Sequence, residues 1–112
     1  MEQSQIRVLV VPCDGTPFVK ILENDPSAID EEIGATAVQL PVGDVYLCFD
    51  QHGKAKGLPS NRTATRLLHN EYSCLVWCEV GGKALLVGRR ESSIEKWDVP
   101  QTVVDELIDP EG

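Results

Sequence analysis

The chain has 112 residues, of which 42% are hydrophobic and 25% are charged, and its formal net charge at neutral pH is −8. This length and composition predict one globular domain, residues 1–112, and exclude a disordered chain, while the acidic balance disfavours direct binding to duplex nucleic acid. The sequence contains no run of 18 apolar residues of the kind that predicts a membrane span, and residues 1–5 lack the features of a secretory signal peptide. We therefore expect a cytoplasmic protein that does not bind a membrane.

The N-terminal third predicts two strands and then a helix. Residues 6–11 are nearly all apolar and β-branched, which is typical of a central strand covered on both faces. Residues 16–22 alternate loosely between apolar and polar side chains and predict a more peripheral strand. A short helix follows, in which Asp25 is the N-cap, Pro26 fits the first helical position and Gly34 ends the helix.

The middle of the chain predicts a hairpin and a second helix. Residues 36–40 and 45–50 are two strand-like runs separated by a short turn sequence, so a hairpin is the simplest arrangement. Ser60 or Asn61 caps a helix that continues to about His69. This helix has an apolar inner face and an outer face that carries two arginines one turn apart.

A second hairpin is predicted after this helix. Residues 73–80 and 83–88 are both strand-like and are joined by Gly81-Gly82, a strong signal for a two-residue turn. Together with the other strands they predict a mainly antiparallel sheet with two to three short helices. The predicted fold class is therefore α+β in a single domain.

The C-terminal part predicts a polar link, residues 89–98, and then an acidic helix that starts at Asp98-Val99-Pro100. Its apolar stripe consists of Val103, Val104, Leu107 and Ile108. Its last turns carry Asp105, Glu106 and Asp109, and acidic groups there oppose the helix dipole. No basic residue follows Lys96, so these carboxylates have no cationic neighbour in the sequence that follows.

The cysteines and histidines predict neither a disulfide nor a metal site. The four cysteines are Cys13, Cys48, Cys74 and Cys78. If residues 73–80 are a strand, Cys74 and Cys78 lie roughly 13 Å apart along it, too far to share a tetrahedral zinc ion. His52 and His69 are not at ligand spacing from any cysteine pair and are expected to be exposed turn and helix-end residues. We expect no metal and no cofactor.

Charge is unevenly distributed along the chain. Residues 1–53 carry a net charge of −7, residues 54–90 carry +5, and residues 91–112 carry −6. The basic block contains the sequence Gly57-Leu58-Pro59-Ser60-Asn61-Arg62, which needs no ligand if it only forms a turn and caps a helix. The alternative is an anion site at the helix N-terminus, with Lys54, Lys56, Asn61, Arg62 and Arg66 as its residues.

The same stretch resembles a family of small, functionally uncharacterised domains carried by bacteriophages, plasmids and other mobile elements. The matching features are the strand at residues 6–11, the strand and turn at 45–53, the element at 57–64, and a hydrophobic strand that ends near Gly88. They cover about three quarters of the chain, and only the Leu-Pro-x-Asn-Arg pattern is specific. Family members often have a glycine in the strand after this element, where this chain has residues 74–78, Cys-Leu-Val-Trp-Cys. The resemblance implies an α+β fold and a mobile-element setting, and it brings no catalytic residues.

We expect a non-catalytic protein, because Asp50, His52, Asn61 and His69 fall in no nucleophile, metal or phosphate-loop motif. Small acidic phage proteins often dock on the basic surface of a host protein. We therefore favour a protein-interaction module that inhibits a host nucleic-acid-directed defence system, of the anti-CRISPR or anti-restriction type. The predicted partner-binding residues are Glu95, Asp98, Asp105, Glu106 and Asp109. The alternative is a module that sequesters a nucleotide or another anion, and a homo-oligomer is compatible with either function.

Overall fold

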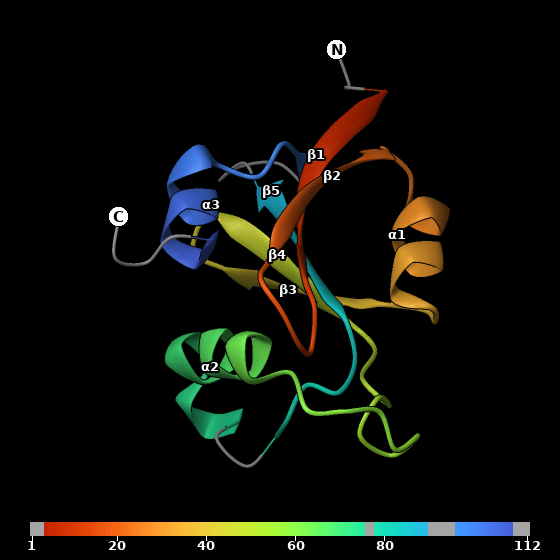
Figure 1. Ribbon diagram of the computed structural model, residues 1–112, viewed down its shortest axis with the longest axis vertical. Helices are drawn as coiled ribbons and strands as arrows, with labels where there is room; N and C mark the ends of the chain where they lie inside the picture. Colours follow the sequence, from red (N-terminus) through yellow and green to blue (C-terminus); the bar gives the residue numbers. More distant parts are fainter. Residues whose placement is uncertain (1–3, 76–77, 90–95, 109–112) are drawn as a thin grey trace.

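The computed structural model describes residues 4–75, 78–89 and 96–108, and these form a single α+β domain, which confirms the predicted fold class (Figure 1). The strands are β1 Gln5–Val11, β2 Phe18–Glu23, β3 Val38–Val42, β4 Val45–Phe49, β5 Ala84–Arg89 and β6 Lys96–Trp97. The helices are α1 Pro26–Ile33, α2 Arg62–Glu71 and α3 Gln101–Ile108, with a 3-10 turn at Ser73–Leu75. All strand pairs are antiparallel, in the order β2-β1-β5-β4-β3, and β6 pairs with β5.

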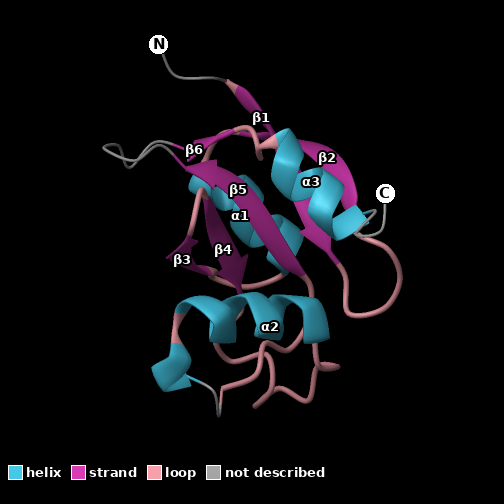
Figure 2. Cartoon of the chain, turned by 90° about the vertical axis from the view of Figure 1, so that its left-hand side faces the viewer, coloured by secondary structure: helices cyan, strands magenta, loops and turns pink. Residues whose placement is uncertain are grey.

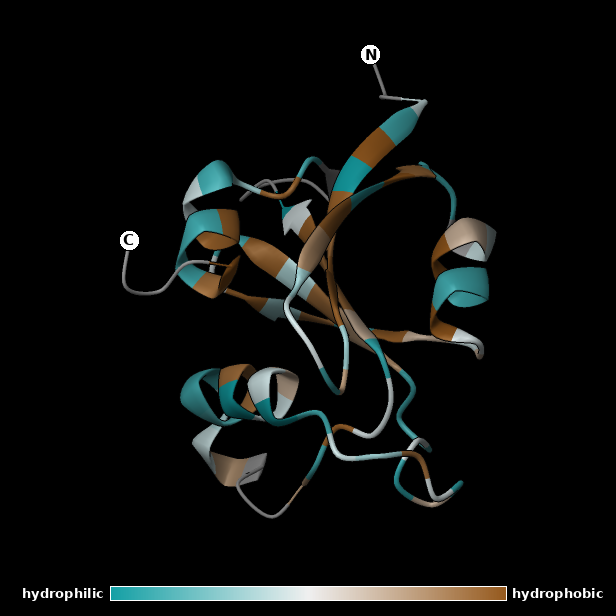
Figure 3. Ribbon diagram, viewed as in Figure 1, coloured by the Kyte–Doolittle hydropathy of each residue, from teal (hydrophilic) through white to brown (hydrophobic). Residues whose placement is uncertain are grey.

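The sheet separates two hydrophobic cores, because successive side chains of a strand point to opposite faces. One core contains Leu9, Leu47 and Leu86 with residues of α2 and α3, and the other contains Val8, Cys48 and Leu85 with residues of α1. Accordingly α2 and α3 lie on one side of the sheet and α1 lies on the other (Figures 1 and 2). Figure 3 shows the hydrophobic residues of α1 and α3 turned toward the sheet and their hydrophilic residues turned away.

The predicted helix boundaries are confirmed for α1 and α2. The Asp25 carboxylate accepts a hydrogen bond from the backbone N–H of Ala28 at 2.9 Å, and Gly34 ends α1 in the left-handed region with φ of 90°. Of the two residues proposed to cap α2, the structure selects Asn61, whose side chain accepts from the N–H of Ala64. Local capping chemistry therefore sets where both helices begin.

The hairpin of β3 and β4 is confirmed, but its turn is tighter than the four residues that separate the two predicted strands. Its register places Val42 opposite Val45, so Gly43 and Asp44 are the two turn residues. Pro41 lies inside β3, although proline has no N–H to donate to a neighbouring strand. This is tolerated because β3 is an edge of the sheet.

The predicted second hairpin is wrong. Ser73–Leu75 form a 3-10 turn and residues 78–80 belong to no strand, while residues 76 and 77 lie outside the described part. The strand β5 pairs with β1, β4 and β6 instead. Gly81 serves a close approach of two backbone segments rather than a hairpin turn, and Gly82 has a φ of 88°, in the left-handed region. A Cβ atom on Gly53 would lie 2.1 Å from the carbonyl oxygen of Gly81.

Because the described residues of the segment 73–80 do not form a strand, the distance expected between Cys74 and Cys78 along a strand does not apply. Cys74 lies in the 3-10 turn and is exposed, whereas Cys78 is half-buried after the turn. The four cysteines, all of which lie among the described residues, form no disulfide. His52 is exposed in a turn as expected, but His69 is half-buried, contrary to expectation.

The C-terminal helix is confirmed, but it begins at Gln101 rather than at Asp98. In the link, residues 90–95 lie outside the described part, and Lys96–Trp97 form β6, with Trp97 opposite Gly88 of β5. The Asp98 carboxylate accepts from the backbone N–H of Arg7 at 2.8 Å, and the N–H of Val99 donates to the Arg7 carbonyl. Among the described helices, none has the length and apolar character needed to cross a membrane.

Candidate functional site

Asn61 connects the start of α2 to the end of β1 and to the segment that precedes β5. Its side-chain amide donates to the carbonyls of Val11 and Gly82 at 2.8 and 3.0 Å, and its oxygen caps α2. Its backbone N–H donates to the carbonyl of Val80 at 2.7 Å, and its side chain is fully buried. All hydrogen-bonding groups of the Asn61 side chain are thus engaged by the fold. The structure places this predicted anion-binding residue where it supports the site rather than contacts a ligand.

The two lysines of the predicted anion site are bound to carboxylates. Lys56 donates to Asp50 at 2.6 Å, and Lys54 lies 3.4 Å from Glu79 and donates to the hydroxyl of Ser60. The hydrogen bond from Lys56, together with one from the backbone N–H of His52, lowers the pKa of Asp50 below its ordinary value. Both lysines therefore hold the loop around residues 50–60 in place.

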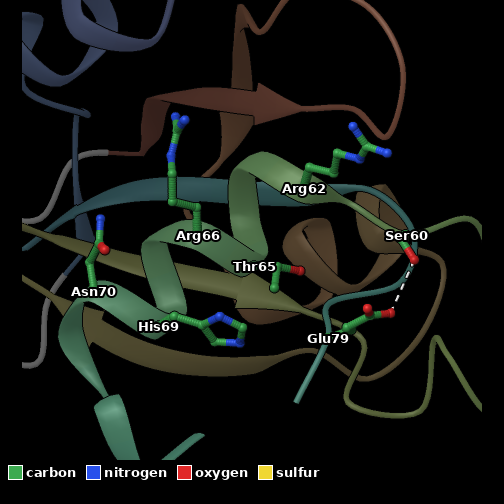
Figure 4. A pocket seen from close by; sticks show the side chains of 7 residues that line it. All are labelled: Ser60, Arg62, Thr65, Arg66, His69, Asn70 and Glu79. Atoms are coloured by element: carbon green, nitrogen blue, oxygen red, sulfur yellow. Dashed lines mark hydrogen bonds between the residues drawn. The ribbon is translucent and has the colours of Figure 1, made fainter. Parts of the chain in front are cut away.

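Arg62 and Arg66 are the two predicted anion-binding residues that remain available. Both are exposed and, among the described residues, neither forms an ion pair. They line a surface groove of about 550 Å³ along α2, here called the arginine groove, with Ser60, Thr65, His69, Asn70 and Glu79. Figure 4 shows the two arginines pointing away from His69 and Glu79, so the side chains of the groove diverge.

His69 and Thr65 fix the segment that follows the 3-10 turn. Nε2 of His69 lies 2.6 Å from the carbonyl oxygen of Cys78, so this nitrogen carries the proton and donates. The hydroxyl of Thr65 accepts from the N–H of Val80 at 2.9 Å. These side chains anchor residues 78–80 to α2, which is a structural role for a histidine that was a candidate catalytic residue.

The acidic residues predicted to bind a partner divide into three groups. Asp105 and Glu106 are exposed on α3, whose Val104 is buried against the sheet, as the apolar stripe predicts. The Asp98 carboxylate is bound to the backbone of β1, which limits its use in binding. Glu95 and Asp109 lie outside the described residues.

The structure adds two acidic residues that the sequence did not single out. Asp44, in the turn between β3 and β4, and Glu71, at the end of α2, line the same crevice as Glu106 of α3. This acidic crevice has a volume of about 230 Å³, and its other lining residues are Val42, Gly43, Val45, Leu67, Leu86, Val103 and Leu107. The three acids come from separate elements, so only tertiary structure brings them together.

Among the described residues, the three acids of the crevice form no ion pair. The guanidinium of Arg89 donates to the carbonyl of Gly43 and lies over the ring of Tyr46, which packs against the core on the α1 side. Asp44, Glu71 and Glu106 are all exposed to solvent.

No protein-family model, curated protein or solved structure matches the chain. Among the described residues, no three His, Cys, Asp or Glu side chains are grouped closely enough to hold a metal ion. What the site can do is therefore inferred from its own geometry and charge.

Proposed function

We propose that this protein is a non-catalytic interaction module that binds a partner protein with a basic surface. The observation that carries the proposal is the outward acidic face of α3, where Asp105 and Glu106 have no cationic partner among the described residues. Charge complementarity of this kind mainly accelerates association and weakens as salt is added. The buried contact of Val104 holds this face on a rigid element.

The proposed biological setting rests on the resemblance to domains of phages and plasmids, which covers residues 6–11, 45–53, 57–64 and the strand that ends near Gly88. In this proposal the partner is a host protein of a nucleic-acid-directed defence system, whose basic surface normally faces phosphates. Carboxylates at the positions of those phosphates would block the surface, in the cytoplasm of a bacterial host. The anti-CRISPR and anti-restriction types of inhibitor both fit this description.

The alternative function, sequestration of a nucleotide or another anion, has less support from the geometry. The volume of the arginine groove falls within the range of roughly 300–1,000 Å³ that is usual for small-molecule sites. Of the five residues predicted for this site, however, Lys54, Lys56 and Asn61 are engaged within the fold. Only the divergent Arg62 and Arg66 remain for a ligand.

The proposed function is tested by reversing charge on α3. The double variant Asp105→Lys, Glu106→Lys is compared with Asp14→Lys, Glu31→Lys, which changes net charge equally at exposed positions elsewhere. Immobilised wild-type and variant proteins are incubated with host lysate at low salt, and the retained proteins are identified by mass spectrometry. We expect a basic protein that wild type and control retain, that the α3 variant loses, and that high salt releases. If the α3 variant and the control retain the same proteins as wild type, the proposal is wrong.

A further inference from the structure

The acidic crevice has the size of a site for a side chain. Its volume of about 230 Å³ is below the range of roughly 300–1,000 Å³ that is usual for small-molecule and cofactor sites. The floor is formed by the buried residues Val45 and Leu86, and the walls include Leu67 of α2 and Leu107 of α3. The aliphatic part of one side chain suits a space of this size with apolar lining residues.

The carboxylates that line the crevice determine which chemical group the tip of that side chain should carry. Asp44, Glu71 and Glu106 line the crevice, and in the described structure none of them has an ion-pair partner. A neutral apolar group would remove water from these carboxylates without replacing its hydrogen bonds, which is unfavourable. A cationic group that donates several hydrogen bonds would replace the lost water and neutralise part of the charge.

We propose that the acidic crevice receives one arginine side chain of the protein partner. The methylene groups of the arginine would pack against Leu67 and Leu107, and the guanidinium would donate to carboxylates of the crevice. Arginine fits better than lysine, because its planar fork carries five donors and is more weakly hydrated than an ammonium group. This inference rests on the proposed function and names the anchor residue of the partner.

The test uses capped tripeptides of the form Gly-X-Gly, in which X is arginine, lysine or citrulline. Citrulline has nearly the shape of arginine but is uncharged. Each peptide is titrated into ¹⁵N-labelled protein, and binding is followed by the shifts of backbone amide resonances. We expect the arginine peptide to shift residues 42–45, 67–71 and 103–107 selectively, the lysine peptide to bind more weakly, and the citrulline peptide to bind at least about tenfold more weakly.

Two adjacent residues of α3 supply a matched pair of variants. Glu106→Gln removes a carboxylate of the crevice, whereas Asp105→Asn removes an exposed carboxylate that does not line it. We expect Glu106→Gln to weaken the arginine peptide by about tenfold and Asp105→Asn by less than about threefold. The amide spectrum of each variant also shows whether it is folded.

Three outcomes would overturn the inference: equal binding of the arginine and citrulline peptides, shifts confined to other surfaces, or no binding of the arginine peptide. Equal effects of Glu106→Gln and Asp105→Asn would also do so, because the crevice would then add nothing to general attraction between charges. Each of these results leaves the proposed function standing if a basic partner is still retained in a salt-dependent manner. If the wild-type protein retains no basic partner, the proposed function itself is wrong.

Discussion

The basic block of residues 54–90 and the acidic crevice use their charges in opposite ways. Lys54, Lys56 and Lys83 form ion pairs within the molecule, and Arg89 binds a backbone carbonyl. The carboxylates of the crevice form no such pairs in the described structure. A concentration of charge along the sequence therefore does not indicate which charges are available for binding. Availability depends on whether the fold supplies a partner.

The largest effect on stability is expected when Asn61, the buried residue of the basic block, loses its side-chain hydrogen bonds. Asn61→Ala removes the two donors to Val11 and Gly82 and the cap of α2, all in a fully buried position. We expect the free energy of unfolding to fall by roughly 3–4 kcal/mol, because buried polar groups lose their partners. Ser60→Ala, at the exposed neighbouring position, should change it by less than about 0.5 kcal/mol.

Chemical denaturation of both variants measures these changes. A loss as small as that of Ser60→Ala would mean that water or a rearranged loop replaces the bonds of Asn61. The buried amide would then be dispensable, and the basic block would be less tightly bound into the fold than we infer.

An intermediate effect is expected for the ion pairs that hold α1 on the sheet. Glu32 accepts from Lys20 at 2.6 Å and from Lys83 at 2.8 Å, and these hydrogen bonds lower its pKa below the ordinary value of 4.5. A carboxylate with a lowered pKa in the folded state stabilises the fold above its unfolded pKa, and this contribution disappears as pH falls through the folded value. We expect Glu32→Gln to lower the free energy of unfolding by about 1 kcal/mol at pH 7.

The difference between wild type and Glu32→Gln should shrink as the pH is lowered below 4.5 and should vanish in more acidic buffer. Urea denaturation at a series of pH values measures it. A difference that stays constant over this range would show that Glu32 acts through packing rather than through its charge.

The smallest effect on stability is expected for the two arginines that depart from the pattern of the basic block. Arg62→Ala combined with Arg66→Ala should change the free energy of unfolding by less than about 0.5 kcal/mol per residue, because both side chains are exposed and unpaired in the described structure. Calorimetric titration with ATP should give the same weak signal for wild type and the double variant. Tight ATP binding that only the wild type shows would favour the anion-sequestering function instead.

Much of the fold could be predicted because its signals are local. Nearly continuous apolar runs identified β1 and β4, while Asp25, Gly34 and Asn61 mark helix ends through contacts within a few residues. Gly81 and Gly82 were misinterpreted because glycine suits both a tight turn and a close backbone approach. The partner that decides between these roles is Gly53, which is distant in the sequence.

The candidate site was less predictable for the same physical reason. Glu106 was singled out because it belongs to an acidic helix, but Asp44 and Glu71 are isolated acids in the sequence, and Glu71 belongs to the basic block. The fold of α2 and the turn between β3 and β4 bring them beside α3. No spacing within the sequence reports such a grouping of distant residues.

The position of β5 has a consequence for the order in which the protein folds. Along the chain β5 follows both hairpins, yet in the sheet it lies between β1 and β4 and pairs with each of them. During synthesis the β1–β2 and β3–β4 hairpins must therefore wait, with two open strand edges, until residues 84–89 have left the ribosome. Such non-local pairing slows folding, and open edges invite pairing with other chains. The period before β5 inserts is thus when the nascent chain is most open to pairing with other chains.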